Sequence, residues 1–385
     1  MPYRQPFTLS IFFIAIFYLG GPMEATIKML ISSPFVSVRN KPIPFILDKE
    51  PDPELSQAMF GRYIDRFKQW LPPAQRDPIQ SSQLLFSEQI ICHQQIDDEW
   101  LFVELLEQDY FSKTKQDFKK VTGYIKQEHA CPIQQFATPN IVVDEPWTSI
   151  QTTYNSILAP MGTKLYGTLS DDKTEYSVLL PDSSSGTIAA SDVYFFAQPV
   201  TESIKAMRNH IISLSKKLIG TPFCWGGRTP YTETITTQPS GFDCSGLFNL
   251  IYRCCGLHIP RNSLSMFLKT TPIDGNQLEP GDLIFFAHAE TPQKVNHVMM
   301  YGGDNLIIEC NISQGVTINS DIVRLNKPIN TIKYGEQLII SFRDMINEPI
   351  VYFGTFLSDK QSMQTLRQET YINYNELLKE RESNQ

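Results

Sequence analysis

The chain has 385 residues, and its 42% apolar content is ample for more than one hydrophobic core. Its formal net charge of −8 argues against nucleic acid or an anionic membrane surface as a partner. The sequence contains no glycine-rich phosphate loop, no Cys-x-x-Cys pair and no His-Glu-x-x-His motif, so it gives no support for a nucleotide or metal cofactor.

Residues 1–25 have the character of a secretory signal peptide. Arg4 and the amino terminus supply positive charge, and an apolar run follows at 9–19. This run is much shorter than the roughly twenty residues that a membrane-spanning helix needs. We expect cleavage near Ala25, export to the periplasm or cell envelope, and no stable membrane insertion afterwards. An uncleaved anchor is the alternative.

Residues 26–134 and 135–199 each contain short apolar runs separated by polar turns, a pattern typical of small β domains. The runs lie at 83–91, 100–103 and 121–125 in the first region, and at 140–143, 157–165, 176–180 and 186–188 in the second. The two regions resemble bacterial SH3-like domains, the second less closely than the first.

Residues 53–71 interrupt this β pattern. Their apolar residues recur at steps of three and four, and Pro53 stands in the first turn, which predicts an amphipathic helix inserted into the first β domain. This helix either covers the domain or forms a wall of the active-site cleft.

Cys244 carries the clearest chemical signature. It lies in the segment Gly-Phe-Asp-Cys-Ser-Gly (241–246), which continues into an apolar helical stretch at 247–252. The thiol would then stand at a helix N-terminus, where backbone N–H groups and the helix dipole stabilise a thiolate. His297 follows in the segment Asn-His-Val-Met-Met-Tyr, and its imidazole would hold the thiol proton as imidazolium. A buried structural cysteine is the alternative.

Four further motifs accompany this pair in sequence. They are Gly-Thr-Pro-Phe-Cys-Trp-Gly-Gly (220–227), Ile-Pro-Arg-Asn-Ser (259–263), Leu-Glu-Pro-Gly-Asp-Leu-Ile-Phe-Phe (278–286) and Leu-Ile-Ile-Glu-Cys (306–310). In this order and spacing, residues 204–343 resemble the NlpC-type papain-like cysteine peptidases, bacterial enzymes that cut peptidoglycan stem peptides. The resemblance implies a papain-like α+β domain over 200–345, in which the Cys244 helix packs on an antiparallel sheet.

The same resemblance implies the catalytic roles. Cys244 matches the nucleophile and His297 the general base, whereas Glu309 stands where the family usually has a second histidine that orients the base. A carboxylate can accept the imidazole N–H, and its charge favours the imidazolium. We therefore predict Glu309 as the third catalytic residue, with a surface glutamate at a strand end as the alternative.

The predicted substrate-contacting residues are Asp243, Ser245, Ser263, Phe223 and Trp225. Asp243 and Ser245 also suit helix capping, a role compatible with substrate contact. Phe223 replaces a family tyrosine whose hydroxyl faces the thiol, so rate or specificity is expected to differ from the family norm.

The activity that the resemblance implies is hydrolysis of the bond between γ-D-glutamate and a diamino acid in peptidoglycan stem peptides or muropeptides, without a cofactor. A cell-wall-peptide-binding protein with little or no turnover, and an amidase or acyltransferase of related fold, are the alternatives. In relatives with this domain order, a carboxylate and a tyrosine of the first SH3-like domain bind the free amine of L-Ala. Residues 80–85 contain no carboxylate, so we expect weak discrimination between free and N-blocked stem peptides.

The seven cysteines are an odd number, so at least one stays free in an oxidising compartment. Their spacing matches no recognised disulfide framework. Residues 346–385 form a charged, glutamine-rich tail, which we expect to be helical at 361–379 and disordered at its end. The sequence gives no indication of the oligomeric state.

Overall fold

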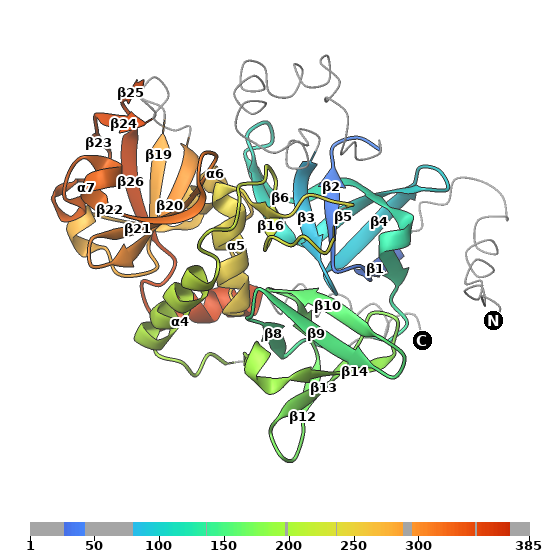
Figure 1. Ribbon diagram of the computed structural model, residues 1–385. Coiled ribbons are helices and arrows are strands. Elements are labelled where there is room, and N and C mark those ends of the chain that lie inside the picture. Colours follow the sequence, from blue (N-terminus) through green and yellow to red (C-terminus); the bar gives the residue numbers. More distant parts are fainter. Residues whose placement is uncertain are drawn as a thin grey trace.

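The computed structural model describes residues 27–42, 80–135, 137–196, 199–235, 237–287, 295–342 and 345–369. The expected signal peptide at 1–25 and the expected helical insertion at 53–71 lie outside these residues. The described chain is mixed α/β, with a first β domain (27–135), a second β domain (137–196) and an α+β domain (204–369) (Figure 1). No helix within these ranges is both long and apolar enough to cross a membrane.

The first β domain is a seven-stranded antiparallel sheet in the order β3-β2-β6-β5-β4-β1-β7. Its strands are β1 (Ile27–Ile31), β2 (Phe35–Arg39), β3 (Gln80–Leu85), β4 (Gln89–Gln95), β5 (Trp100–Ser112), β6 (Asp117–Lys126) and β7 (Ala130–Pro132). The apolar run at 83–91 therefore does not form one strand. It divides into β3 and β4 at a turn where Ser87 adopts a left-handed conformation with φ of 65°.

The second β domain combines a five-stranded sheet, β10-β9-β14-β13-β12, with a three-stranded sheet, β11-β8-β15. Its strands are β8 (Ile141–Val143), β9 (Trp147–Thr152), β10 (Ser156–Pro160), β11 (Lys164–Leu165), β12 (Gly167–Leu169), β13 (Glu175–Leu179), β14 (Ser185–Ala189) and β15 (Val193–Phe195). Each β domain has its own apolar core. The SH3-like assignment of both domains stays a prediction.

The α+β domain contains a seven-stranded antiparallel sheet in the order β18-β26-β19-β20-β21-β22, with β23 paired to β26. Its helices are α4 (Ile204–Lys217), α5 (Cys244–Cys254), α6 (Ser263–Lys269) and α7 (Asp321–Leu325). Its strands are β16 (Arg228–Thr229), β17 (Gly241–Phe242), β18 (Thr271–Ile273), β19 (Leu283–Ala287), β20 (Val295–Gly303), β21 (Leu306–Asn311), β22 (Gly315–Ser320), β23 (Glu336–Gln337), β24 (Ile340–Phe342), β25 (Met345–Asn347) and β26 (Ile350–Thr355). Short 3₁₀ helices lie at Gln127–His129, Ala190–Asp192, Gly275–Gln277 and Ile329–Thr331.

Helix α5 is the centre of this domain. Ten of its eleven residues are buried, which is expected of a helix enclosed on all sides rather than on one face. It packs against β20 and β21 on one side and against β16 on another, so it lies between the sheet and the β domains (Figure 1). The expected arrangement of a Cys244 helix on an antiparallel sheet is confirmed.

The sheet extends beyond the domain end that the sequence analysis placed at residue 345. Strand β26 pairs with β19 along its length, from Leu283 opposite Gly354 to Ala287 opposite Ile350. The expected tail at 346–385 therefore contains a strand of the sheet, β26. Residues 360–369 are helical, as expected, and the rest of the predicted tail helix lies outside the described residues.

A buried ionic cluster joins the three domains. Arg228 donates to both carboxylate oxygens of Glu88 at 2.7 and 2.9 Å, and Arg253 lies 3.3 Å from the same carboxylate. Glu107 accepts from Arg253 and, at 3.0 Å, from Lys164 of the second β domain. Burial alone would raise the pKa of Glu107, but the two cations hold it below its usual range. Burial lowers the pKa of Lys164 to about 8.

Strand β3 of the first β domain also contacts the loop before β16 directly. Gln80 Nε2 donates to the carbonyl of Trp225 at 2.6 Å, and Gln83 Oε1 accepts from the backbone N–H of Arg228 at 2.7 Å. A side chain on Gly226 would collide with the Gln80 carbonyl, and its φ of 68° also favours glycine. The first β domain therefore fixes the conformation of this loop.

Candidate active site

Cys244 is the first residue of α5, as the sequence predicts. Asp243 caps the helix: its Oδ1 accepts from the N–H groups of Ser245 at 3.1 Å and Gly246 at 2.6 Å. The predicted capping role of Asp243 is therefore confirmed. Gly246 lets the helix start approach the neighbouring loop, because a Cβ there would lie 2.0 Å from the Gly227 carbonyl oxygen.

His297 and Glu309 lie on the adjacent strands β20 and β21. The strands pair with Met300 opposite Ile308. Extending this register by one position puts Glu309 opposite Met299 and diagonal to His297 on the same face of the sheet, within reach of long side chains. His297 Nε2 lies 2.8 Å from Glu309 Oε2. The sheet thus pairs the two residues that the sequence analysis selected.

The second hydrogen-bond partner of the His297 ring is Cys244. Burial alone would lower the pKa of His297, but hydrogen bonds to Cys244 and Glu309, and the negative charge of both, raise it to about 9. Nε2 faces Glu309, which leaves Nδ1 for the thiol. The imidazole is therefore positioned to be charged at neutral pH beside the sulfur atom.

Glu309 is a buried carboxylate, with 2% of its side chain exposed. Burial would raise its pKa, but the His297 hydrogen bond and the charge of Arg324 outweigh burial and lower the pKa to about 2. Arg324 Nε donates to Glu309 Oε1 at 2.6 Å, and its guanidinium lies over the Phe286 ring, 5.0 Å from the ring centroid.

Arg324 lies on the short helix α7 and is not among the site residues predicted from the sequence. No motif surrounds it. The signal that was available is Glu309 itself, because a carboxylate inside a strand of the core needs a cationic partner to remain charged.

Asp243 has a second partner besides the helix start. Arg261 Nη1 and Nη2 donate to the two oxygens of its carboxylate at 3.0 and 2.8 Å. Ser245 is buried, donates to Asp243 Oδ1 at 3.0 Å and accepts from Arg261 at 3.2 Å. Arg261 Nε in turn donates to Ser82 of β3 at 2.9 Å. Any substrate amine at Asp243 would therefore share this carboxylate with an arginine.

The other predicted substrate-contacting residues are separated by the fold. Phe223 is buried in the large core cluster against which Cys244 packs, and it forms a parallel β-bridge with Phe242, two residues before Cys244. Trp225 is on the surface, with its carbonyl held by the first β domain. Ser263 is partly exposed at the first turn of α6.

Ser263 lines a hollow of about 490 Å³ between the turn that joins β5 to β6 and the start of α6. Its described lining consists of Tyr110, Phe111, Ser112, Lys113, Thr114, Asn262, Ser263, Leu264 and Val295. Val295 is two residues from His297, and Asn262 follows the arginine that holds Asp243. The hollow therefore has walls from two domains and is lined by sequence neighbours of His297 and Arg261, although Cys244, His297 and Glu309 are not among its described lining residues. Its described lining has one cation and no carboxylate.

The remaining six cysteines differ from Cys244. All seven cysteines are described, and none forms a disulfide. Burial raises the pKa of Cys131 to about 11 and that of Cys254 to about 12, and it also raises the pKa values of Cys255 and Cys310. Cys244 is the cysteine that has an imidazole partner in the described chain.

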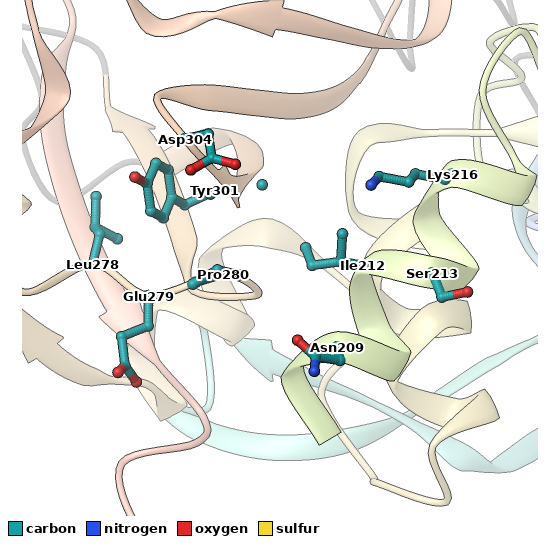
Figure 2. Close-up of a pocket in the computed structure, with 11 residues that line it drawn as sticks. Asn209, Ile212, Ser213, Lys216, Leu278, Glu279, Pro280, Tyr301 and Asp304 are labelled. Carbon is teal, nitrogen blue, oxygen red and sulfur yellow. The ribbon is translucent and has the colours of Figure 1, made fainter. Parts of the chain in front are cut away.

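A second hollow, of about 570 Å³, lies between α4 and the turn that joins β20 to β21 (Figure 2). Asn209, Ile212 and Lys216 of α4 lie across it from Tyr301 and Asp304, and Ser213 is also among its lining residues. None of the three predicted catalytic residues lines it. Among the described residues there is no group of three or more His, Cys, Asp or Glu side chains that could hold a metal ion.

Comparison with known proteins identifies the region around Cys244. The NlpC/P60 family profile matches residues 220–334. The chain is 31% identical over 221 residues to a gamma-D-glutamyl-L-lysine dipeptidyl-peptidase of Bacillus cereus, an alignment that covers 57% of each protein. It is 31% identical over 120 residues to a probable endopeptidase p60 of Listeria grayi, covering 31% of this chain and 21% of that protein.

The chain thus spans little more than half of the first relative and about a fifth of the second. A crystal structure of an NlpC/P60 family protein from Bacillus cereus superimposes with a TM-score of 0.60 at 23% identity, covering 84% of this chain and 98% of the other. That likeness shows a shared fold. Taken with the profile match, it identifies residues 220–334 of this chain as an NlpC/P60 family domain.

Proposed function

We propose that this protein is a cysteine peptidase that hydrolyses peptidoglycan stem peptides at the bond between γ-D-glutamate and a diamino acid. The observation that carries the proposal is the hydrogen-bonded series Cys244, His297, Glu309. A nucleophile at a helix start, a base beside it and a carboxylate that orients the base are the parts of a cysteine-peptidase site.

In the proposed reaction, His297 holds the Cys244 proton and the thiolate attacks the carbonyl carbon of the scissile amide. The backbone N–H of Cys244 precedes the first intrahelical hydrogen bond of α5, so it is available to the oxyanion that forms. His297 then protonates the leaving amine, and the acyl group remains on the sulfur. Water, deprotonated by His297, attacks the thioester and releases the acid.

The substrate class is supported by the names of the relatives, since the Bacillus cereus protein is a gamma-D-glutamyl-L-lysine dipeptidyl-peptidase. We assign the substrate peptide to the hollow beside Ser263, because its lining includes Val295, two residues from His297, and Asn262, the residue after Arg261. Ser263 would contact the peptide directly. Asp243 and Ser245, held by Arg261, would fix the start of α5, and Phe223 would back the thiol.

Export to the periplasm or cell envelope is part of the proposal, because peptidoglycan is found there. In this arrangement the first β domain, with its proposed SH3-like fold, forms one wall of the substrate hollow. Its residues Tyr110 and Lys113 would face the peptide from the side opposite Ser263.

Digestion of defined muropeptides followed by mass spectrometry tests the proposal, since the products identify the bond and the diamino acid. Wild-type protein should release a fragment ending in γ-D-glutamate, and Cys244→Ala should reduce cleavage to background while the fold is retained. Cys131→Ala, a half-buried cysteine in the first β domain, is the matched control and should keep wild-type activity. Cleavage by Cys244→Ala above a few per cent of wild type would refute the assignment.

Iodoacetamide provides an independent measurement on the same proteins. Cys244 should be alkylated at neutral pH well before five other cysteines whose pKa values burial raises, namely Cys92, Cys131, Cys254, Cys255 and Cys310. Selective alkylation without any cleavage of muropeptides would favour the peptide-binding alternative. Acyl transfer to an amine in place of hydrolysis would favour the acyltransferase.

A further inference from the structure

The chain of interacting side chains formed by Cys244, His297 and Glu309 continues to a fourth residue, Arg324. Each oxygen of the Glu309 carboxylate has its own partner: Oε2 faces His297 at 2.8 Å, and Oε1 accepts from Arg324 at 2.6 Å. Arg324 is 12% exposed and is itself held over the Phe286 ring. The Phe286 ring also neighbours the imidazole, with 6.2 Å between the ring centroids of Phe286 and His297. Four elements, α5, β20, β21 and α7, therefore contribute one residue each to a continuous series.

The residue type at 309 explains why a fourth member is present. A neutral imidazole at this position would need no counter-ion, whereas a carboxylate removed from water needs partners for its charge and for both oxygens. His297 satisfies one oxygen. Arg324 satisfies the other, and its Nε–H fixes the rotation of the carboxylate so that Oε2 points to the imidazole.

We propose that Arg324 is a positioning residue of the active site, which acts on His297 by holding the Glu309 carboxylate in place. The proposal rests on the proposed function, because it assigns a role relative to the Cys244 and His297 pair. Arg324 contacts neither the thiol nor the substrate in this arrangement, so it is not itself a catalytic residue.

A positioning role and a purely electrostatic role of Arg324 predict opposite changes in the pKa of His297 when Arg324 is removed. Among the described residues, the titratable groups that face His297 are Cys244 from α5 and Glu309 from β21, with Arg324 from α7 behind Glu309. If Arg324 acts only as a nearby positive charge, its removal raises the pKa of His297. If it holds Glu309 in place, its removal lets the carboxylate turn away, and the pKa of His297 falls.

The test compares Arg324→Ala, Arg324→Lys and the control Val323→Ala, an exposed neighbour on α7. Their kcat and KM are measured on a free L-Ala-γ-D-Glu-L-Lys tripeptide. The pKa of His297 is measured by NMR, with its signal identified by its absence in His297→Gln. Arg324→Ala should lower kcat about 10- to 100-fold with little change in KM, by analogy with the loss of groups that orient metal-ligating histidines. The pKa of His297 should fall.

In Arg324→Lys the pKa of His297 should be close to the wild-type value, and kcat should lie between those of wild type and Arg324→Ala. Val323→Ala should match wild type in both measurements. Should the alanine variant fail to fold, Arg324→Gln replaces it, because glutamine keeps an N–H donor without the charge. Its kcat should lie between that of wild type and the value predicted for Arg324→Ala. A wild-type kcat, or a raised pKa of His297, in folded Arg324→Ala would overturn the positioning role, and the same result in Arg324→Gln would do so if the alanine variant does not fold. If Cys244→Ala is also inactive, that result leaves the proposed function intact, whereas an active Cys244→Ala refutes the proposed function itself.

Discussion

Replacement of Glu88 by glutamine tests how strongly the first β domain is joined to the α+β domain. The Glu88 carboxylate accepts from the Leu85 N–H at 2.7 Å and from Arg228 at 2.7 and 2.9 Å, and it neighbours Arg253. The side chains of Glu88 and Arg228 are each 1% exposed. Glutamine has the same shape but only one acceptor oxygen, and its amide N–H₂ would face the guanidinium donors.

The substitution leaves Arg228 as a buried cation whose principal counter-ion is lost. Removing one partner of a buried ion pair costs about 3–5 kcal/mol of unfolding free energy. At about 2 °C per kcal/mol, the value for large domains, the melting temperature should fall by roughly 6–10 °C. Differential scanning calorimetry measures this change directly. Activity on muropeptides should fall as well, because Arg228 and Gln83 hold the loop beside Cys244.

Two further variants complete the measurement. Glu145→Gln removes a half-exposed partner of Lys217 and should cost less than about 1 kcal/mol. The double variant Glu88→Leu, Arg228→Met should recover most of the stability lost in Glu88→Gln, since it leaves no unpaired charge at this position. If Glu88→Gln lowers the unfolding free energy as little as Glu145→Gln does, the ionic cluster does not hold the domains together.

Three other predictions concern the site. Glu309→Gln keeps an acceptor and loses the charge, so it should reduce kcat less than Glu309→Leu. The losses in kcat should lie between roughly 10- and 10,000-fold, as for an orienting group. Wild-type kinetics in the leucine variant would show that Glu309 has no catalytic role. His297, with its pKa raised from 6.5 to about 9, should stabilise the fold fully below pH 6.5 and lose this contribution as the pH rises through 9. The kcat/KM profile should fall on the same alkaline side, and in Glu309→Gln this fall should move to lower pH. Free and N-acetylated tripeptides should have similar kcat/KM, because the described lining of the Ser263 hollow has no carboxylate for an amine; absolute dependence on the free amine would contradict this.

Local sequence signals were sufficient for the helix that carries Cys244, since the Asp243 cap and the apolar residues after it predicted the start of α5. The sheet on which this helix packs, which includes β19, β20 and β21, was implied by the resemblance to NlpC-type peptidases. A signal was also present for β26, whose residues Ile-Val-Tyr-Phe are typical of a strand, although the expected domain end at 345 excluded it.

The side-chain pairings could not be predicted in the same way. Arg228 and Glu88 are 140 residues apart, and Arg253 and Glu107 are 146 apart, so no local pattern relates them. The pairing of Asp243 with Arg261 is closer in sequence, but it depends on how the chain returns after α5. Such contacts follow from tertiary packing, which periodicity and capping motifs do not encode.

The hydrogen bonds from β3 to the loop at 225–228 and to Arg261 have a consequence for protein engineering. A truncated protein that begins at α4 would lose Glu88, which binds Arg228, and Ser82, which is one of the acceptors of Arg261, together with the donor to the Trp225 carbonyl. We therefore expect the α+β domain to be unsuitable for transfer on its own into fusion proteins. A functional chimera should keep both β domains and the α+β domain together as a single unit, because Lys164 of the second β domain also belongs to the ionic cluster, with new modules added outside them.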